Sequence, residues 1–306
     1  MLRPSNAQGL MTEDPIRLVV HGSPGSAPPV MAEALRAAVV AAGLAPWSLL
    51  PRGDDPGIDA IAELNRQVSA GDILSTCTPV FLQAPLLRGL PKSHGRLTPI
   101  TRMVADRFLL VVSSACPATD LPGFIAWARR QPTRTGGYFR GCINHLLGLD
   151  VAVACDAKAE FVLVPSEPAV WSALLSGAID WAVGTPVEVI AHLDAGSMRA
   201  IATLDTARLP RFPEVPTFGE VTGKPLPFQL WRGLIGPPGM APAAREAMLV
   251  AVRAARLQAP WRDYLAANGQ QDDPLEGDDF SRFLDAQWDS YRRQLGTAGL
   301  LHPAHA

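Results

Sequence analysis

The sequence lacks the features that mark several common chemistries. Its four cysteines lie far apart and form no C-x-x-C pair, which excludes a zinc knuckle and a thioredoxin-like motif. We expect them to be free thiols, buried or half-buried, with disulfide pairing in an oxidising compartment as the alternative. Lysine and arginine are scattered and the formal net charge is −2, so the chain lacks the basic surface that binds nucleic acid or an anionic membrane. Nucleic acid is therefore not expected as a partner.

Long apolar runs are also missing. No stretch approaches the ~18 to 20 apolar residues of a transmembrane helix, so we expect no direct membrane insertion. The opening MLRPSNAQGLMTEDP has one arginine but no apolar core of ~7 to 15 residues, so no signal peptide is visible. With 306 residues, 48% of them hydrophobic and 18% charged, the chain is typical of folded protein and long enough for two domains. Residues 1–14 and 301–306 are expected to be flexible termini.

Strand-like and helical segments alternate along the chain. The first series occupies residues 16–20, 29–43, 45–51, 57–68 and 72–79. Its β-α-β-α-β order predicts an α/β fold, with a mostly parallel sheet and helices on both faces. A second series runs from about 110 to 225 and begins with RFLLVVSS, whose unbroken apolar pattern predicts a strand buried on both faces.

Local signals refine the second half of the chain. Asp120 is placed to cap a helix, and TRTGGYFRG is expected to be a glycine-rich loop before another helix. From residue 228 the pattern indicates a strand, a helix entered through Pro242 and two amphipathic helices. Trp261, Phe283 and Trp288 are spaced as core residues rather than as ligand-binding aromatics.

The turn after the first strand, HGSPGSAPPV, lacks the residues of three familiar sites. It contains no lysine, which a Walker loop requires, and too few glycines for the dinucleotide fingerprint. His21 stands where a nucleophile elbow has glycine. Two interpretations remain, a small-anion site without a catalyst and a tight turn with serine caps. The residues concerned are Gly22, Ser23, Pro24, Gly25 and Ser26.

A second candidate lies in GGYFRGCINHLLG. Gly141, Cys142, Asn144 and His145 would stand in the first turn of a helix, where free N–H groups and the helix dipole attract a carboxylate. Three interpretations stay open: ligand contact, a packing or capping role, and a Cys/His nucleophile, since a thiol at a helix start can have a lowered pKa. The nucleophile lacks an evident residue to orient the imidazole.

Further polar residues follow predicted strands, where a ligand cleft between two units would be lined. They are Thr76, Cys77, Thr78, Ser166, Gly184 and Thr185. The six histidines show neither the H-x-E-x-x-H pattern nor another ligand spacing, so we expect no metal and no cofactor.

Taken together, these segments resemble a known family, the substrate receptors of tripartite tricarboxylate transporters, also called Bug proteins. The resemblance runs from PIRLVV to about GTAGL. Its landmarks are PIRLVVHGSPG, FVLVPSEPAVWSALLSGAIDWAV, AGSMRAIATLDTARLPRFPEVPTFGEV and WRGLIGPPGMAPAAREAM. The part RLPRFPEVPTFGE is similar to the specific family signature R-x-P-x-x-P-x-V-P-T-x-x-E.

The resemblance implies a type II periplasmic binding-protein fold, two α/β domains with a ligand cleft between them. We predict residues 15–109 together with 228–300 as the first domain and 110–227 as the second. The resemblance also implies a periplasmic, non-enzymatic receptor that captures a small carboxylated metabolite for membrane transporter subunits. We further expect a monomer. A cytoplasmic ligand-binding or sensor paralogue without a transporter is the alternative, which the missing signal peptide favours, and a Cys/His enzyme is the third hypothesis.

Carried over by position, the family's ligand loops fall on Gly22 to Ser26 and on Thr76 to Thr78, whose backbone amides and ordered water would hold the carboxylate. In the second domain the implied contacts are Gly141, Cys142, Asn144, His145, Gly184 and Thr185. The chain departs from the family at His21 and Ser26, at the loop LLPRGDDPGI, and at Gly184, where an acidic residue is common. These departures point away from a plain dicarboxylate of the usual size.

Overall fold

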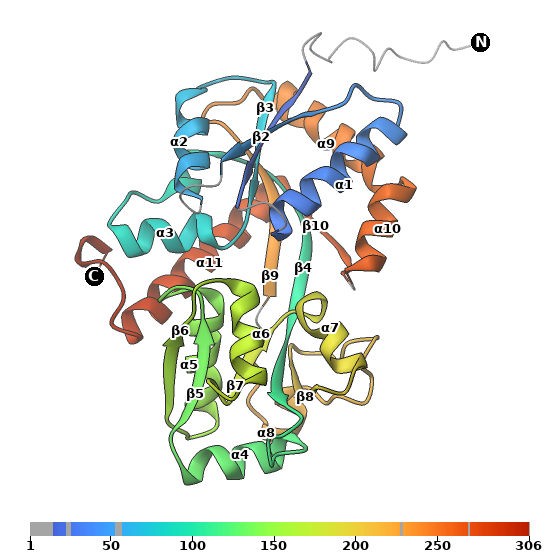
Figure 1. The fold of residues 1–306 in the computed structure, drawn as a ribbon. Coiled ribbons are helices and arrows are strands. Elements are labelled where there is room, and N and C mark those ends of the chain that lie inside the picture. Colours follow the sequence, from blue (N-terminus) through green and yellow to red (C-terminus); the bar gives the residue numbers. More distant parts are fainter. Residues whose placement is uncertain (1–14, 23–25, 53–56, 227–228, 269, 306) are drawn as a thin grey trace. The chain divides into compact units, whose positions relative to one another are not determined.

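The structure is a computed structural model that describes residues 15–22, 26–52, 57–226, 229–268 and 270–305 (Figure 1). The chain forms two compact units. The first comprises the described residues of 1–104 and 231–291 with His305, and the second those of 105–230 and 292–304. Residues 1–14, expected to be a flexible terminus, lie outside the described residues, and Pro303–His305 form a short 3-10 helix. The domain limits proposed from the sequence stay a prediction.

The first unit is built on a mixed sheet with the strand order β10-β4-β9-β3-β1-β2. Strand β1 pairs in parallel with β2 and β3, whereas β9 runs antiparallel to β3 and β10 antiparallel to β4. Its elements are β1 (Arg17–His21), α1 (Ala27–Ala41), β2 (Ser48–Arg52), α2 (Ile58–Arg66), β3 (Ile73–Cys77), α3 (Val80–Arg88), a 3-10 helix (Ser93–Gly95), α9 (Pro242–Arg256), α10 (Ala259–Ala267) and β10 (Asp272–Glu276). Three elements have residues in both units: β4 (Thr98–Ser113), β9 (Gln229–Gly236) and α11 (Gly277–Thr297).

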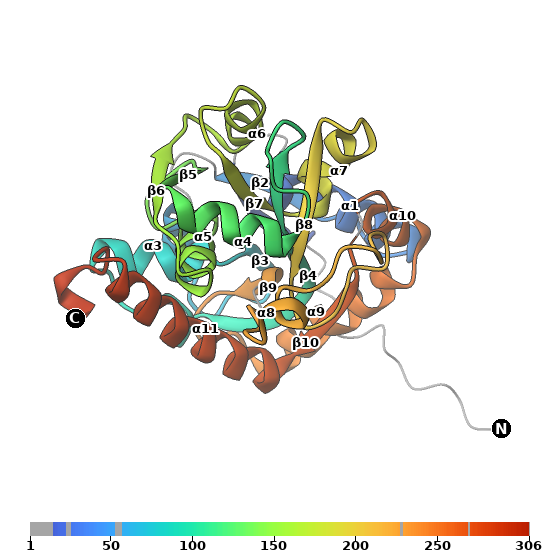
Figure 2. The same cartoon turned by 90° about the horizontal axis from the view of Figure 1, so that it is seen from below.

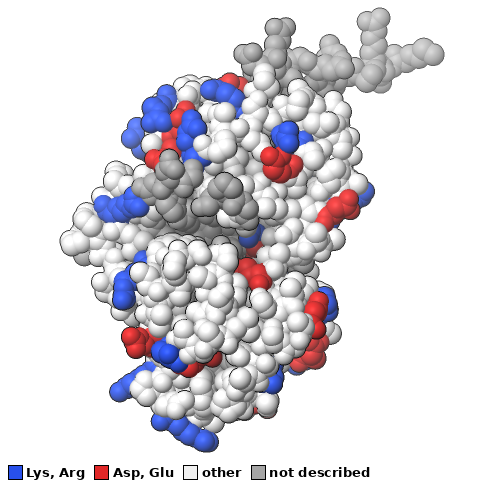
Figure 3. All heavy atoms as spheres, in the orientation of Figure 1, with Lys and Arg blue, Asp and Glu red and all other residues white. Residues whose placement is uncertain are grey.

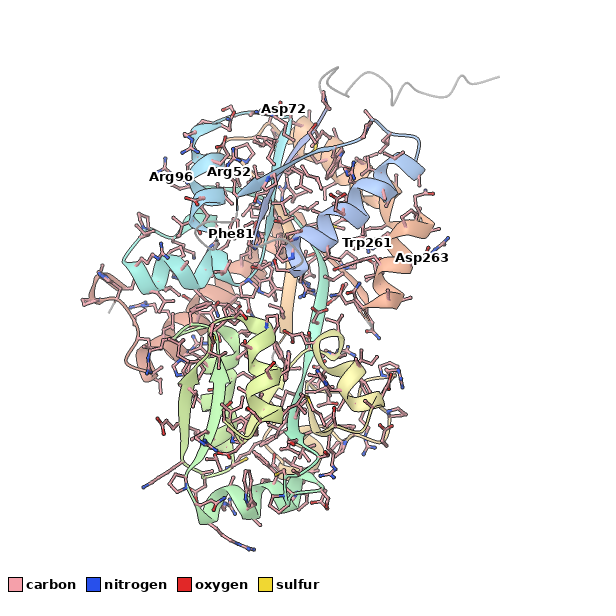
Figure 4. All side chains as sticks on the ribbon, viewed as in Figure 1. Arg52, Asp72, Phe81, Arg96, Trp261 and Asp263 are labelled. Atoms are coloured by element: carbon pink, nitrogen blue, oxygen red, sulfur yellow. The ribbon has the colours of Figure 1, made fainter. Side chains whose placement is uncertain are left out.

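One core of the first unit lies between its strands and the helices α1, α9 and α10. Leu18 and Val20 point into it from β1, because alternate residues of a strand share a face. Trp261 on α10, labelled in Figure 4, is fully buried there and stacks at a tilt on Tyr264. Trp288 is buried and Phe283 half-buried, so the predicted core role of these aromatics is confirmed for the two tryptophans.

The second unit has three layers. Its elements are α4 (Leu121–Arg130), β5 (Thr133–Gly137), α5 (Ile143–Ala154), β6 (Ala159–Leu163), α6 (Glu167–Leu175), β7 (Trp181–Gly184), α7 (Pro186–Asp194), β8 (Met198–Leu204) and α8 (Phe218–Thr222). Strand β4 pairs antiparallel with both β7 and β8, and β5 pairs in parallel with β6. Figure 2 shows α4 and α5 on one side of β7 and β8, and α6 and α7 on the other.

Strand β4 explains why the second unit has two cores. Phe108, Leu110 and Val112 face the core beneath α4 and α5, while Leu109 and Val111 face the core beneath α6 and α7. The prediction of a strand buried on both faces is thus confirmed. Asp120 caps α4 as predicted, because its carboxylate accepts the N–H of Gly123 at 2.7 Å.

The structure departs from the sequence analysis at two points and adds one strand that the sequence analysis did not assign. The segment TRTGG is strand β5 rather than loop. It pairs with β6 through backbone hydrogen bonds, which glycine residues can form as well as other residues. The acidic segment Asp272–Glu276 is strand β10, paired at an edge with β4. The sheet of the first unit is mixed rather than mostly parallel, since β9 and β10 join it antiparallel.

Charged side chains of both signs are interspersed on the face of the molecule shown in Figure 3, as the scattered sequence positions indicate. Among the described residues, no helix combines the length and the apolar character needed to cross a membrane.

Candidate functional site

The first polar cluster consists of His21, Thr76, Cys77 and Thr78, at the carboxyl ends of β1 and β3. The parallel register pairs Leu18 with Leu74 and Val19 with Ser75, so the two strand ends lie side by side. All four residues are buried, with 3% of His21 and 8% of Thr78 exposed. The sequence placed Thr76, Cys77 and Thr78 in a ligand site, and the structure brings Thr76 and Thr78 together around the His21 ring.

His21 is held on both ring nitrogens. Nδ1 lies 3.0 Å from the Thr76 carbonyl oxygen and 2.8 Å from Thr76 Oγ1, and Nε2 lies 3.0 Å from Thr78 Oγ1. Phe81, labelled in Figure 4, packs its ring against the imidazole in an edge-on arrangement with the centroids 5.0 Å apart. Together, these contacts fix the orientation of the imidazole ring.

The pKa of His21 is lowered to about 4, chiefly by burial; the hydrogen bond to the Thr76 carbonyl raises the pKa, and the nearby Arg232 guanidinium lowers it. The imidazole is therefore neutral at physiological pH. Arg232 itself is 2% exposed, on β9. Burial also raises the pKa of the Cys77 thiol, so it stays protonated.

The turn that leads from β1 to α1 is only partly described. Gly22 adopts a φ of +99°, and a Cβ there would stand 2.7 Å from Ser26 Oγ, so glycine is required on conformational grounds. Ser23, Pro24 and Gly25 of the predicted site lie outside the described residues. Helix α1 begins after Ser26, and Pro28 and Pro29 in its first turn carry no N–H. The first turn of α1 therefore offers an anion fewer backbone N–H donors than a helix start without proline would.

The second polar cluster consists of Gly141, Cys142, Asn144 and His145 at the start of α5. Gly141, with a φ of +90°, donates its N–H to His145 Nδ1 at 3.0 Å. The imidazole stacks on Phe161 with the centroids 3.9 Å apart. Because Nδ1 accepts this hydrogen bond, the neutral ring carries its own hydrogen on Nε2. No other described residue is hydrogen-bonded to that nitrogen, and burial lowers the pKa of His145.

Asn144 connects the helix start to the end of β7. Its Nδ2 donates to the Val183 carbonyl at 2.8 Å, which brings Gly184 and Thr185 beside the second cluster. The N–H and the hydroxyl of Thr185 both donate to Glu188 Oε2, at 2.6 and 2.8 Å, in a capping box that begins α7. Thr185 thus has a structural task, and its ligand contact stays a prediction.

Ser166 precedes α6 and is exposed, and no hydrogen bond joins its side chain to the second cluster among the described residues. Its role as a ligand contact is likewise still a prediction.

Cys142 is fully buried at the N-cap of α5. A Cβ on Gly137 would stand 2.8 Å from its Sγ, so the thiol packs against the backbone of β5. Burial raises the pKa of this thiol, whereas the nucleophile hypothesis needs it lowered. The observed environment is that of a packed thiol.

Sequence reasoning missed three residues at these clusters. Trp171 of α6 fills the space over Gly184, where a Cβ would stand 2.2 Å from the indole ring. Glu188 holds Thr185, and the spacing T-P-V-E is the capping-box signal that identifies it. Arg232 lies in the middle of β9, and no local pattern marks it as close to His21.

No group of three or more His, Cys, Asp or Glu side chains that could hold a metal ion occurs in the described part of the chain.

Comparison with solved structures identifies the class of fold. A TctC solute-binding protein from Polaromonas superimposes with a TM-score of 0.77 and 23% identity, covering 92% of this chain and 98% of that one. The R. palustris protein Rpa4515 with adipate gives a TM-score of 0.80 at 19% identity (93% and 97% covered). MatC from Rhodopseudomonas palustris with bound malate gives 0.74 at 18% (92% and 98% covered). The chain has the α/β fold of the periplasmic solute-binding proteins, as the sequence predicted.

Sequence comparison then gives the family. Residues 57–299 match the model of the tripartite tricarboxylate transporter family receptor, TctC, and the chain belongs to this family of substrate-binding receptors. A curated relative, a UPF0065 protein of Bordetella pertussis, is 26% identical over 212 residues. The match covers 68% of this chain and 65% of that protein, so the chain spans just under two thirds of its length.

Proposed function

We propose that the protein is a receptor that binds a small carboxylated metabolite and delivers it to a tripartite tricarboxylate-type transporter. The observation that carries the proposal is the family match across residues 57–299. Two structural neighbours hold dicarboxylates, malate in one and adipate in the other, which supports an acid as the ligand class.

The two clusters support binding rather than catalysis. The Nε2–H of His145 is a neutral donor at the start of a helix, where the dipole also favours an anion. The cluster cysteines are buried thiols whose raised pKa disfavours thiolate. We assign the ligand contacts to Gly22, Ser26, Thr76, Thr78, Asn144 and His145, with Ser166, Gly184 and Thr185 as further candidates.

A thermal-shift screen tests the ligand class. A compound that binds only the folded chain, at 100 times its Kd, adds about 2.7 kcal/mol to the free energy of unfolding. We expect adipate, malate or a related acid to raise the melting temperature, and the matched diamide adipamide to leave it unchanged. If no carboxylated compound in a panel of ~100 acids shifts the midpoint, the proposal fails.

His145 supplies the first site-directed test. His145→Phe keeps the aromatic stack on Phe161 and removes the Nε2–H donor. Loss of one hydrogen bond costs about 1 kcal/mol, which corresponds to a roughly five-fold weaker Kd for the bound acid, measured by calorimetry. The control is His302→Phe, an exposed histidine whose Nδ1 accepts the N–H of Ala304. Equal affinity of both variants would remove His145 from the site.

The compartment and the partner are part of the same proposal. We assign the receptor to the periplasm, the compartment from which tripartite transporters take up their substrates. Fractionation of the native host with an antibody against the chain tests this assignment. Recovery with the cytoplasmic fraction would instead support a cytoplasmic ligand-binding or sensor protein.

A further inference from the structure

A contact between a carboxylate and an amide joins two helices of the second unit. Gln294, near the end of α11, donates its Nε2–H to Asp150 Oδ2 of α5 at 2.9 Å. Both side chains are half-buried. In the described part of the chain, no Lys, Arg or His forms an ion pair with this carboxylate. An ionised Asp150 is therefore bonded here to a neutral amide.

The contact satisfies only one of the two polar atoms of the amide. Gln294 Oε1 is buried and accepts no hydrogen bond from any described residue. A buried carbonyl oxygen without a donor lowers the stability of the fold. Rotating the amide by half a turn would not help, because Oε1 would then face a carboxylate, which has no proton to donate.

Protonation of Asp150 supplies the missing donor. A carboxylic acid has one O–H group and keeps an acceptor oxygen. When a planar acid and a planar amide share one N–H···O bond, their two remaining oxygens can lie side by side, and the acid O–H then donates to the amide oxygen. The protonated pair thus makes two hydrogen bonds where the ionised pair makes one.

The surroundings of Asp150 favour the neutral form. Burial raises the pKa of this carboxyl, and the hydrogen bond from Gln294 opposes the rise without cancelling it. The other titratable side chain of α5 is His145, in the first turn of the helix. Charged residues on the neighbouring elements α4, β5, β6 and α11 do not contribute to the raised pKa. They are Arg129, Arg130, Arg134, Glu160, Arg292 and Arg293.

We propose that Asp150 and Gln294 form a latch that fastens the end of α11 to α5 and that tightens when Asp150 is protonated. The latch connects the helix that begins with the second cluster to a helix whose first residues belong to the other unit. Because the folded chain holds this proton more firmly than the unfolded chain, the latch is tightest below the ordinary pKa of aspartate, and it weakens as the pH rises through the raised pKa of the folded chain.

Hydrogen exchange of the full-length protein measures how firmly the end of α11 is held. In the unmodified chain, we expect the backbone amides of residues 294–298, corrected for intrinsic rates, to exchange about five-fold more slowly at about pH 4.5 than at about pH 7.5, since one hydrogen bond is gained. Equal corrected rates at the two pH values would overturn the proposal.

Two substitutions separate the latch from simple packing. Asp150→Asn mimics the protonated acid, because its amide can donate to Gln294 Oε1 and accept from Nε2. It should exchange slowly at both pH values. Gln294→Met keeps the length of the side chain and removes both bonds, so it should exchange fast at both. An Asp150→Asn variant that exchanges as fast as Gln294→Met, or that keeps the pH dependence, contradicts the latch.

Asp156→Asn is the matched control. It removes the same charge just beyond the end of α5, at an exposed residue whose φ of +54° asparagine also tolerates. Its exchange at residues 294–298 should follow that of the unmodified chain at both pH values. Loss of the pH dependence in this control would assign the effect to net charge and overturn the latch.

A titration of the unmodified protein gives a readout that does not depend on any variant being stable. The carboxyl carbon-13 resonance of Asp150 should titrate above the ordinary aspartate pKa of 3.8. The side-chain amide nitrogen of Gln294 should shift with the same midpoint, because its carbonyl gains a donor in the acid form. A Gln294 resonance that does not respond to the Asp150 titration overturns the proposal.

Discussion

The two polar clusters place a histidine at comparable points of their units, yet they leave it with opposite hydrogen-bonding capacity. His21 lies at the end of β1 and has both nitrogens occupied, by Thr76 and Thr78. His145 lies in the first turn of α5, receives one N–H from Gly141, and keeps Nε2–H as a donor. The same side chain is therefore an internal positioning group in the first unit and a candidate ligand donor in the second.

The difference comes from the backbone that surrounds each ring. A strand end beside another parallel strand offers His21 a carbonyl, which can only accept, and side-chain hydroxyls, which can donate or accept; of these, the carbonyl favours a donor at Nδ1. A tight turn before a helix offers a free N–H, which requires an acceptor at Nδ1. Residue type alone thus does not fix the role of a histidine, whereas its local backbone does.

The largest expected effect concerns the packing of Trp171 against Gly184 at the second cluster. A Cβ on Gly184 would stand 2.2 Å from the Trp171 ring, and that ring is 6% exposed within a core. Gly184→Ala should lower the free energy of unfolding by about 3 kcal/mol, because the indole must shift against its neighbours. Urea denaturation followed by tryptophan fluorescence measures the change.

The control for this prediction is Gly95→Ala in the first unit. A Cβ there meets only the Lys92 side chain, at 3.9 Å, which is ordinary contact. Its expected effect is within about 0.5 kcal/mol. Similar stabilities of the two variants would mean that Trp171 moves freely and does not define the second cluster.

The next effect is the pH dependence of the first cluster. The pKa of His21 is lowered to about 4 in the folded chain, below the ordinary 6.5. Between pH 6.5 and 4, His21 therefore binds a proton in the unfolded chain but not in the folded chain. The free energy of unfolding has its full value above pH 6.5 and decreases as the pH falls from 6.5 toward 4. For this group we expect a loss of up to about 3 kcal/mol.

Comparison of variants isolates that contribution. The pKa of His94 is also lowered to about 4, and carboxylates protonate in the same range, so the unmodified protein shows a larger total loss. His21→Phe should flatten the stability profile between pH 6.5 and 4, while His302→Phe should leave its slope unchanged. Parallel profiles for all three proteins would contradict the buried, neutral state of His21.

The sequence predicts most of the fold because its signals are local. Hydrophobic periodicity locates the strand and helix of each β-α pair, and Asp120 marks the start of α4. The segments that were wrongly predicted or left unassigned owe their structure to distant partners. Asp272–Glu276 has poor strand propensity and becomes β10 only through pairing with β4, and the glycines of Thr133–Gly137 are held by β6.

The candidate site was predictable to a smaller degree for the same reason. The positions of Thr76 and His145 follow from strand and helix ends, which the pattern shows. The proton on each histidine depends on contacts across the sheet or within a turn, such as that of His21 with a residue 55 positions away. Arg232 illustrates the limit, because its proximity to His21 arises only when β9 joins β3.

Labelling of the cysteines is expected to have the smallest effect on the fold. It tests the comparison of the two clusters directly, because each cluster contains one cysteine. Cys77 and Cys142 belong to different clusters, yet both are buried and have a raised pKa, whereas Cys116 is half-exposed. N-ethylmaleimide at about pH 7.5 should label Cys116 first, and the cluster cysteines only after unfolding, as mass spectrometry of peptides can show. Native labelling should leave acid binding unchanged. Rapid modification of Cys142 with loss of binding would instead reveal an accessible thiol, and the Cys/His hypothesis would then account for the second cluster better than ligand donation by His145.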